Sequence, residues 1–215
     1  MTANGGNRLV LLLIAGIPVT MMLAATWLWY FVVEGELDLV GTMGTANRGT
    51  LLQPPRQVDD IDLFDEGIPA TYAELEPRWT LAVPAGNASC DENCERALYV
   101  TRQIHVAIGK DYNRIRRIVF SERDAATLPL GITRLSDDRP LPADFAALLA
   151  GEHRGMKALR LARGGFDALF AEWHDDPSTW YLIDPRGWVM MSYNSDIPYK
   201  DVISDLKFLL KNSSG

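Results

Sequence analysis

The chain lacks several signatures of catalysis and of nucleic-acid binding. Among its 215 residues there are only two cysteines and three histidines. Lys and Arg number 21 against 28 Asp and Glu, so the formal net charge is −7. We therefore expect no nucleic-acid partner, because the phosphates would repel an acidic chain. The sequence has no glycine-rich phosphate loop, no nucleophile elbow and no internal repeat. The two cysteines are left as the main candidates for chemistry.

One long apolar run lies near the N-terminus. Leu9 to Val33 is a stretch of 25 uncharged residues, enough to cross about 30 Å of hydrocarbon at about 1.5 Å per residue. The run is too long for the core of a cleavable signal. It ends in aromatic residues typical of a membrane interface, namely Trp27, Trp29, Tyr30 and Phe31. The run therefore predicts an uncleaved transmembrane helix over residues 9–33, with the lipid bilayer as its partner.

The charges that flank this run predict its orientation. Arg8 precedes the run, whereas Glu34, Glu36 and Asp38 follow it. Positive charge favours the cytoplasmic side of a membrane. We therefore expect residues 1–8 in the cytoplasm, an inner-membrane anchor, and a C-terminal domain in the periplasm. Two cysteines in that oxidising space are expected to pair unless a metal ion or a reductant intervenes.

The remainder of the chain divides at about residue 76. Residues 34–76 are rich in Gly, Pro and acidic residues and show weak periodicity, which predicts a tether and an irregular segment leading into the domain. Residues 77–215 have clear patterns. The expected elements are a strand over 79–83, a helix capped by Ser89 and ended by Gly109, a strand over 116–120, a helix over 142–150, a strand or helix over 156–163, helical turns over 164–173, a hairpin over 179–183 and 188–192, and a helix from Pro198 to about Lys211. This order predicts an α/β domain with a thioredoxin-like fold, in which the first two strands pair in parallel.

The two cysteines stand four residues apart where the first helix of the domain is expected to begin. Cys90 and Cys94 would then lie on one face of the first turn, where they can share a soft metal ion or form a disulfide. The N-terminus of a helix stabilises a thiolate. The acidic neighbours Asp91, Glu92 and Glu95 act in the opposite direction.

The sequence resembles the Sco (SenC-like) proteins, which assist copper insertion into cytochrome c oxidase. The matching features are the single N-terminal anchor, the CxxxC of Cys90 and Cys94 after a strand, and the Tyr181–Gly187 hairpin before a C-terminal helix. A closer likeness is to small membrane proteins found alongside bacterial cytochrome oxidase genes, through Asn47–Arg56 and Cys90–Tyr99. The chain departs from Sco proteins at Glu95, where they usually have proline.

The resemblance implies a copper site and a partner. Cu(I), which prefers thiolates and accepts imidazole, would be held by Cys90 and Cys94, with His174 as the candidate third ligand. His174 lies about two residues upstream of the family's histidine, and Asp176 is nearer the expected position. Zinc would need a fourth ligand, for which the sequence offers no clear candidate. The implied partner is a cytochrome c oxidase subunit.

Three functions remain open from the sequence. The first is delivery of Cu(I) to an oxidase subunit. The second is reduction of a client's copper-binding cysteines, with Cys90, expected to be the more exposed, as the attacking thiolate and Cys94 as the resolving thiol. The third is a scaffold that binds oxidase subunits through the anchor and Asn47–Arg56.

Several other residues are expected to have structural roles or no role in the site. His105 lies on the apolar stripe of the cysteine helix and is expected to be a partly buried, satisfied histidine. His153 is given no role, and Arg114, Arg116 and Arg117 are expected to form a solvated turn. Pro177 could occupy the cis-proline position of thioredoxin-like proteins, although the trans form is favoured by frequency.

Overall fold

The computed structural model describes residues 4–33, 47–86 and 88–213, without the side chains of 4–11, 28 and 31–33. The chain divides into two compact units, Met1–Ala46 and Asn47–Gly215, each described here by itself. In the first unit the described residues form a helix, α1 (Asn4–Val33), with Pro18 inside it, so the helix expected over 9–33 is present. Within the part of the chain that the structure describes, no helix combines the length and the apolar character needed to cross a membrane.

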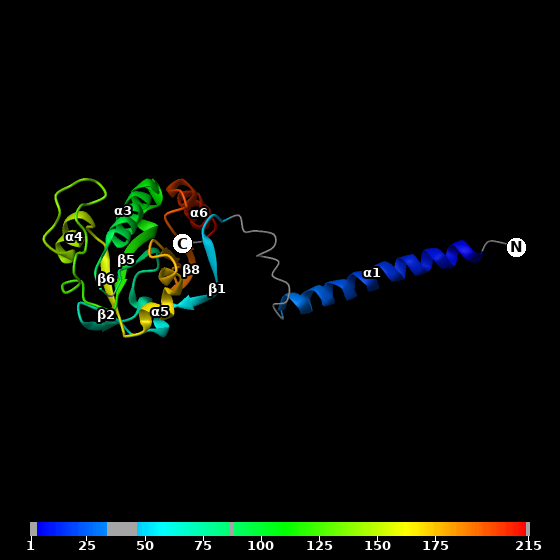
Figure 1. Ribbon diagram of the computed structural model, residues 1–215. Coiled ribbons are helices and arrows are strands. Elements are labelled where there is room, and N and C mark those ends of the chain that lie inside the picture. The colour runs from blue at the N-terminus through cyan, green and yellow to red at the C-terminus, as the bar shows by residue number, and fades with distance from the viewer. Residues whose placement is uncertain (1–3, 34–46, 87, 214–215) are drawn as a thin grey trace. The chain divides into compact units, whose positions relative to one another are not determined.

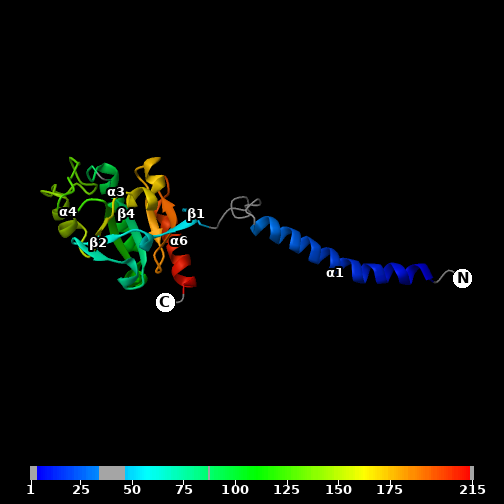
Figure 2. The same cartoon turned by 90° about the horizontal axis from the view of Figure 1, so that it is seen from below.

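The second unit is built on a single mixed sheet of eight strands in the order β1-β8-β7-β4-β5-β6-β2-β3. The central strands β4, β5 and β6 are parallel, and the other neighbours pair antiparallel. The strands are β1 (Thr50–Gln57), β2 (Leu63–Asp65), β3 (Ile68–Ala70), β4 (Trp79–Pro84), β5 (Ile115–Ser121), β6 (Lys157–Leu161), β7 (Trp180–Ile183) and β8 (Trp188–Tyr193). Figures 1 and 2 place β1 and β2 toward opposite edges of the sheet.

The described residues of this unit also form four α-helices and four short 3-10 turns. The helices are α3 (Glu92–Ala107), α4 (Phe145–Glu152), α5 (Gly165–Leu169) and α6 (Tyr199–Asn212). The 3-10 turns are η1 (Val58–Asp60), η2 (Tyr72–Glu74), η3 (Gly109–Arg114) and η4 (Ala171–His174). The strand–helix–strand order of β4, α3 and β5, followed by the β7–β8 hairpin and α6, confirms the expected α/β order and its parallel first pair.

The sheet has an apolar core on each face, because successive side chains of a strand point to opposite sides. In β4, Leu81 and Val83 belong to a core that also contains residues of α3, α4 and α6. Ala82 belongs to the other core, together with residues of α5. In β7, Leu182 and Tyr181 divide in the same way. The unit is therefore a helix–sheet–helix sandwich, and both cysteines lie in the α3 core.

The segment before β4 differs from the expected tether, because residues 47–76 belong to the folded unit. Their strand β1 pairs with β8 at an edge of the sheet, and the register shifts between Leu51 and Arg56, where Pro54 and Pro55 lie. Proline is tolerated at an edge strand or an irregularity, since no central ladder loses a hydrogen-bond donor there. The predicted boundary at residue 77 is thus wrong for residues 47–76, and residues 34–46 lie outside the described residues.

The motif Asn47–Arg56 is explained by contacts within the domain. The carboxylate of Asp205 on α6 accepts hydrogen bonds from the backbone N–H groups of Arg48 and Gly49 and from the hydroxyl of Tyr193. Arg56 forms an ion pair with Glu172 and donates a hydrogen bond to the carbonyl of Leu169. Both sets of contacts fasten the edge strand to segments more than 100 residues later in the chain.

The remaining helix and hairpin predictions differ from the structure mainly at their ends. The expected helix over 142–150 is α4, which begins at Phe145 after the capping residue Asp144. The segment over 156–163, left open between strand and helix, forms β6. The hairpin is confirmed, with Asp184 accepting hydrogen bonds from the backbone N–H groups of Arg186 and Trp188. Gly187 follows with φ +89°, a backbone conformation that glycine adopts without strain.

Candidate dithiol–disulfide site

The two cysteines meet in a disulfide after the end of β4. Cys90 and Cys94 are bonded to one another with their Cα atoms 5.2 Å apart. The chain reaches them through Ala85, whose N–H donates to Phe120 O and extends the pairing of β4 with β5. The expectation that the two sulfurs lie side by side is therefore confirmed.

The start of α3 lies slightly later than the sequence suggested. Asp91, not Ser89, is the N-cap residue, and its side chain accepts a hydrogen bond of 3.0 Å from the N–H of Cys94. Cys90 thus precedes the helix, and only Cys94 lies in its first turn. A carboxylate outranks the predicted serine here because Asp91 is the residue whose extended backbone directs its side chain at the free N–H groups of the first turn.

Both cysteines are buried, with exposed fractions of 0% for Cys90 and 2% for Cys94. The prediction that Cys90 is the more exposed thiol is therefore wrong. The cover is a loop that we call the strap, Leu128–Arg139, which lies between β5 and α4. Cys90 forms an isolated parallel bridge with Leu130 of the strap, in which Cys90 N–H donates to Pro129 O and Gly131 N–H donates to Cys90 O, each at 2.9 Å.

Glu95, which stands where Sco proteins usually have proline, is a buried carboxylate beside Cys94. Its two oxygens accept hydrogen bonds from Ser136 of the strap, one from the backbone N–H at 3.0 Å and one from the hydroxyl at 2.5 Å. Of the three acidic neighbours of the cysteines, Asp91 and Glu95 are thus engaged with N–H or O–H donors. Their charge is partly compensated, which lessens the repulsion that they would exert on a thiolate.

His174 is not assembled with the cysteine pair. It ends η4 as an exposed side chain, and its Nε2 lies 2.8 Å from Asp167 Oδ1. In the described parts of the chain, no three or more His, Cys, Asp or Glu side chains are grouped so that they could hold a metal ion. The expected set of Cys90, Cys94 and His174 is therefore not formed in this structure. The η4 turn does reach the same end of the sheet, since the ring of Trp173 packs on Gly86, four residues before Cys90.

Asp176, the alternative third ligand, is also occupied elsewhere. Its carboxylate accepts hydrogen bonds from Ser178 N–H at 2.9 Å, from Ser178 Oγ at 2.7 Å and from Asn194 Nδ2 at 3.0 Å. The hydrogen bond from Ser178 lowers the pKa of Asp176 below its usual value. The peptide bond before Pro177 is trans, because among the described residues the cis peptide bond is Gln53–Pro54.

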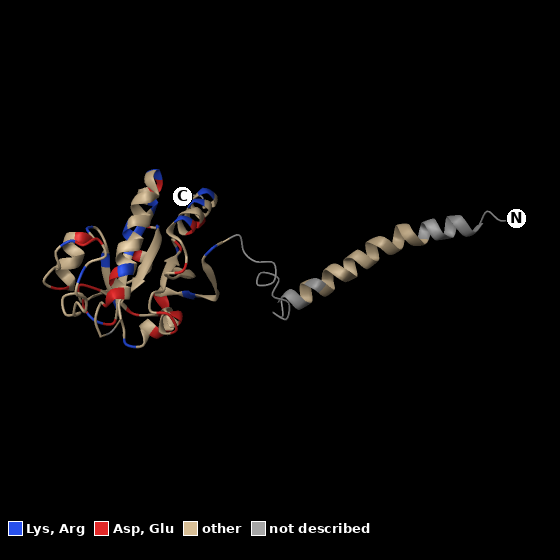
Figure 3. Cartoon of the chain, turned by 45° about the horizontal axis from the view of Figure 1, so that its top comes forward, with Lys and Arg blue, Asp and Glu red and all other residues tan. Residues whose placement is uncertain are grey.

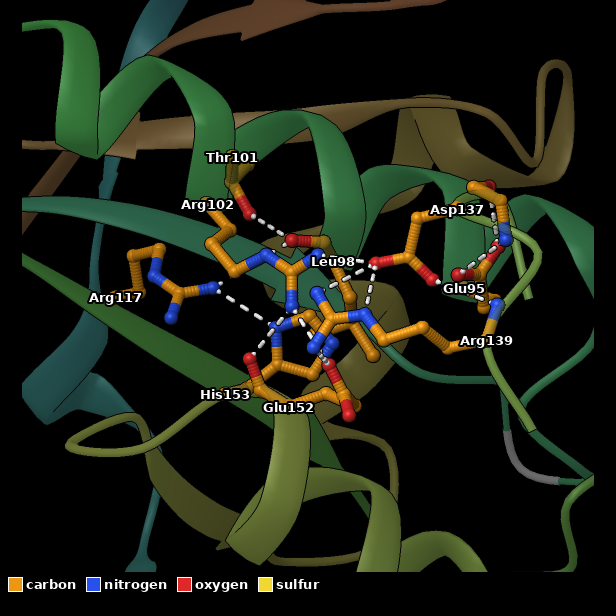
Figure 4. A network of polar contacts seen from close by, with 10 residues as sticks. Glu95, Leu98, Thr101, Arg102, Arg117, Asp137, Arg139, Glu152 and His153 are labelled. Atoms are coloured by element: carbon orange, nitrogen blue, oxygen red, sulfur yellow. Dashed lines mark hydrogen bonds and ion pairs between the residues drawn. The ribbon is translucent and has the colours of Figure 1, made fainter. Parts of the chain in front are cut away.

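A buried basic contact joins β5 to the end of α4, beside α3 (Figure 4). Arg117 of β5 is only 6% exposed and donates a hydrogen bond of 3.1 Å to Nδ1 of His153, which is 2% exposed. A guanidinium can only donate, so Nδ1 must be unprotonated. Burial, and then the positive charge of Arg117, lower the pKa of His153 to about 3. Burial likewise lowers the pKa of Arg117 to about 10.

These positions correct two interpretations from the sequence. Arg117 does not belong to a solvated turn, because it points into the α3 side of the sheet between Leu98 and His153. His153 has a structural role as the acceptor for that buried cation. His105 agrees with its prediction: it is buried, its Nε2 lies 2.9 Å from Tyr112 O, its ring stacks on Tyr112, and burial lowers its pKa.

The strap was not predicted from the sequence, although its apolar residues are a signal of packing. Leu128, Leu130, Ile132 and Leu135 are apolar residues spaced through a loop rich in Pro, Gly and Asp. Apolar residues in such a loop indicate that it packs on something, and Leu128, Ile132 and Leu135 are buried in the same core as the cysteines. The partner of the strap could not be identified from the sequence.

The surface near the pair offers a small groove and a mixed charge. A groove of about 230 Å³ flanks the start of α3, lined there by Asn93, Arg96 and Ala97 and across from it by Trp180 and Tyr199. A larger cavity of about 630 Å³ lies between β5, β6 and the loop after β5, and neither cysteine lines it. Basic and acidic residues are interspersed over the folded unit (Figure 3).

Comparisons with solved structures return Sco proteins at low identity. Yeast Sco1 with copper bound is 17% identical and covers 80% of this chain and 97% of its own, with a TM-score of 0.49. Bradyrhizobium japonicum ScoI with copper bound is 20% identical and covers 72% and 96%, with a TM-score of 0.45. BsSco, described as having a disulfide switch and as a member of the Sco family of cytochrome c oxidase assembly proteins, is 16% identical and covers 80% and 99%, with a TM-score of 0.46.

Comparison with curated proteins gives no match. Among protein families, residues 79–213 match the one described as "Transmembrane-like, thioredoxin-like, C-terminal domain". This match spans the unit from β4 to α6, including both cysteines, and the chain therefore belongs to this transmembrane-like, thioredoxin-like family.

Proposed function

We propose that this protein is a membrane-anchored accessory factor of cytochrome c oxidase assembly whose Cys90–Cys94 pair exchanges electrons with client cysteines. The observation that carries the proposal is the disulfide between the two cysteines at the start of α3. The resemblance of Asn47–Arg56 and of the CxxxC stretch to proteins encoded beside oxidase genes supports the choice of client. The uncharged run Leu9–Val33 supports an inner-membrane anchor with the folded unit in the periplasm.

In the reduced protein, one thiolate of the pair attacks a client disulfide. A mixed disulfide forms, and one client sulfur leaves as a thiolate that takes up a proton. The second thiolate then attacks the mixed disulfide, releases the other client sulfur and closes the Cys90–Cys94 bond. Two electrons and two protons thus pass to the client, and a dithiol reductant must supply them again for the next cycle.

Neither cysteine is favoured as the attacking group by exposure, because both are buried. The two cysteines differ in their position relative to α3. Cys94 lies in the first turn, where its backbone N–H donates a hydrogen bond to the Asp91 side chain, whereas Cys90 precedes the helix. The N-terminus of α3 stabilises negative charge on sulfur in its first turn, which favours the thiolate in the reduced pair.

Cu(I) is the second candidate, as cargo of the reduced pair. Reduction of the Cys90–Cys94 disulfide would leave two neighbouring thiolates, and a pair of thiolates suits this soft ion. The residues do not fit the expected three-ligand site, since His174 is engaged with Asp167. We therefore propose binding of copper only through Cys90 and Cys94, and only in the reduced protein.

Complementation tests the two functions together. In a strain lacking the gene, Cys90→Ser/Cys94→Ser is expected to abolish oxidase assembly, measured as oxidase activity in membranes, whereas His174→Ala is expected to support normal assembly. Full complementation by the double serine variant would leave only a scaffold role.

Metal binding separates exchange from copper delivery. The full chain in detergent is reduced, loaded with Cu(I) and dialysed against a Cu(I) chelator, beside the oxidised chain and His174→Ala. Copper retained by reduced wild type and by His174→Ala, but not by the oxidised chain, supports delivery. A reduced wild-type chain that retains no copper would eliminate delivery and leave thiol exchange.

A further inference from the structure

The strap contacts the peptide that carries Cys90, and its apolar residues share the core in which both cysteines are buried. The bridge between Cys90 and Leu130 provides two backbone hydrogen bonds of 2.9 Å. The approach is close: a Cβ atom built on Gly131 would lie 2.7 Å from Ser89 Oγ and 3.6 Å from Cys90 O. With the strap in this position Cys90 is 0% and Cys94 2% exposed, so neither sulfur is open to a thiol or a client chain.

The C-terminal half of the strap is held by side-chain contacts of a different kind. Ser136 donates to Glu95, and Asp137 accepts a hydrogen bond of 2.7 Å from Arg102 of α3. Arg102 and Arg139 also bond to Glu152 at the end of α4. We call this set of contacts the clamp; Figure 4 shows it gathered between α3, the strap and α4.

The clamp joins the strap directly to the helix that carries Cys94. Glu95 follows Cys94 in sequence, and Arg102 lies about two turns further along α3. The ion pairs are partly open to solvent, with side-chain exposures of 15% for Arg102 and 18% for Asp137. Loops held by partly exposed polar contacts open at lower free energy than sheet strands do.

We propose that the strap is a lid over the disulfide and that the clamp sets how often the lid opens. The inference rests on the proposed thiol exchange and concerns its regulation. With the lid open, a thiolate of a dithiol reductant attacks one sulfur of the pair, and the other cysteine leaves as a thiolate and is protonated. The second thiolate of the reductant then releases the mixed disulfide, so the pair gains two electrons and two protons while the reductant becomes a disulfide.

Asp137→Asn tests the clamp, and Asp138→Asn is its matched control. The first substitution keeps the size of the side chain but removes the charge that faces Arg102 and Arg139. Asp138 is the next residue, exposed and with φ +58°, which asparagine tolerates, and its carboxylate forms no hydrogen bond or ion pair among the described residues. The full chain in detergent is mixed with increasing dithiothreitol, and the rate of thiol appearance is measured.

For wild type we expect this rate to level off at high dithiothreitol, because opening of the lid becomes limiting. Loss of a charge-assisted, partly exposed contact should raise the limiting rate about fivefold in Asp137→Asn. Asp138→Asn should match wild type. A rate that rises linearly in all three proteins, with no difference between them, would overturn the lid.

Hydrogen exchange of the oxidised wild-type chain provides a test that needs no variant. The N–H groups of Cys90 and Gly131, which form the bridge, should exchange faster than those of β4, because the strap opens without unfolding of the sheet. Exchange of the bridge N–H groups at the rate of β4 would refute local opening. Failure of the proposed function is distinguishable: the pair would then be inert to thiols in every variant, or dispensable in the complementation assay, however the lid behaves.

Discussion

The buried contact between Arg117 and His153 predicts a specific dependence of stability on pH. His153 is 2% exposed and accepts a hydrogen bond from Arg117, so its protonation in the folded protein would place two positive charges together in the interior. The perturbation is His153→Gln. Glutamine does not titrate in this range, and its side-chain oxygen can accept the same hydrogen bond from Arg117.

The magnitude follows from the pKa of His153, which falls from an ordinary value of 6.5 to about 3 in the folded protein. Between these values the unfolded chain binds the proton and the folded chain does not, so stability falls as pH falls through 6.5 and this loss levels off below about 3. At pH 5 the loss is about 2 kcal/mol, since each pH unit below 6.5 contributes about 1.4 kcal/mol.

The assay is urea unfolding of wild type and His153→Gln at pH 7.5 and pH 5, followed by tryptophan fluorescence. Wild type should lose about 2 kcal/mol more than His153→Gln over this interval, because all other titrating groups are common to both chains. Equal losses in wild type and His153→Gln would refute the argument that His153 stays neutral against Arg117.

Three further predictions concern stability of the folded unit. Asp205→Ala should lower the free energy of unfolding by about 2–4 kcal/mol in urea unfolding, since its 4%-exposed carboxylate accepts three hydrogen-bond donors; a loss below about 1 kcal/mol would contradict this role. Gly49→Ala should lower the free energy of unfolding by about 1–3 kcal/mol, because the new Cβ would lie 2.5 Å from the Tyr193 ring. Gly151→Ala, with open space around it on α4, should leave the free energy of unfolding unchanged or raise it. Thermal unfolding of both variants tests this order. Reduction of the disulfide should cost about 2 kcal/mol through release of a short loop; an unchanged urea midpoint would refute that estimate.

Local patterns in the sequence determined much of the secondary structure of this protein. The alternation of apolar residues, the Asp184–Gly187 turn and the position of Pro198 were enough to predict the hairpin and the last helix, because turn chemistry and periodicity act over a few residues. Only two cysteines, four residues apart, sufficed to predict that their sulfurs meet, since so short a separation leaves little freedom.

Contacts between distant segments could not be predicted from these local patterns. That Pro54 and Pro55 lie in an edge strand depends on β8, more than 130 residues later, and the burial of Arg117 depends on His153 from the end of α4. The burial of the cysteines likewise depends on the strap, whose residues follow Cys90 by about 40 positions. His174 was expected as a copper ligand from family spacing, whereas in the structure its Nε2 lies 2.8 Å from Asp167 Oδ1, seven residues earlier in the chain. The sequence determined which groups can do chemistry, whereas the packing of remote segments decided which of them meet and which are covered.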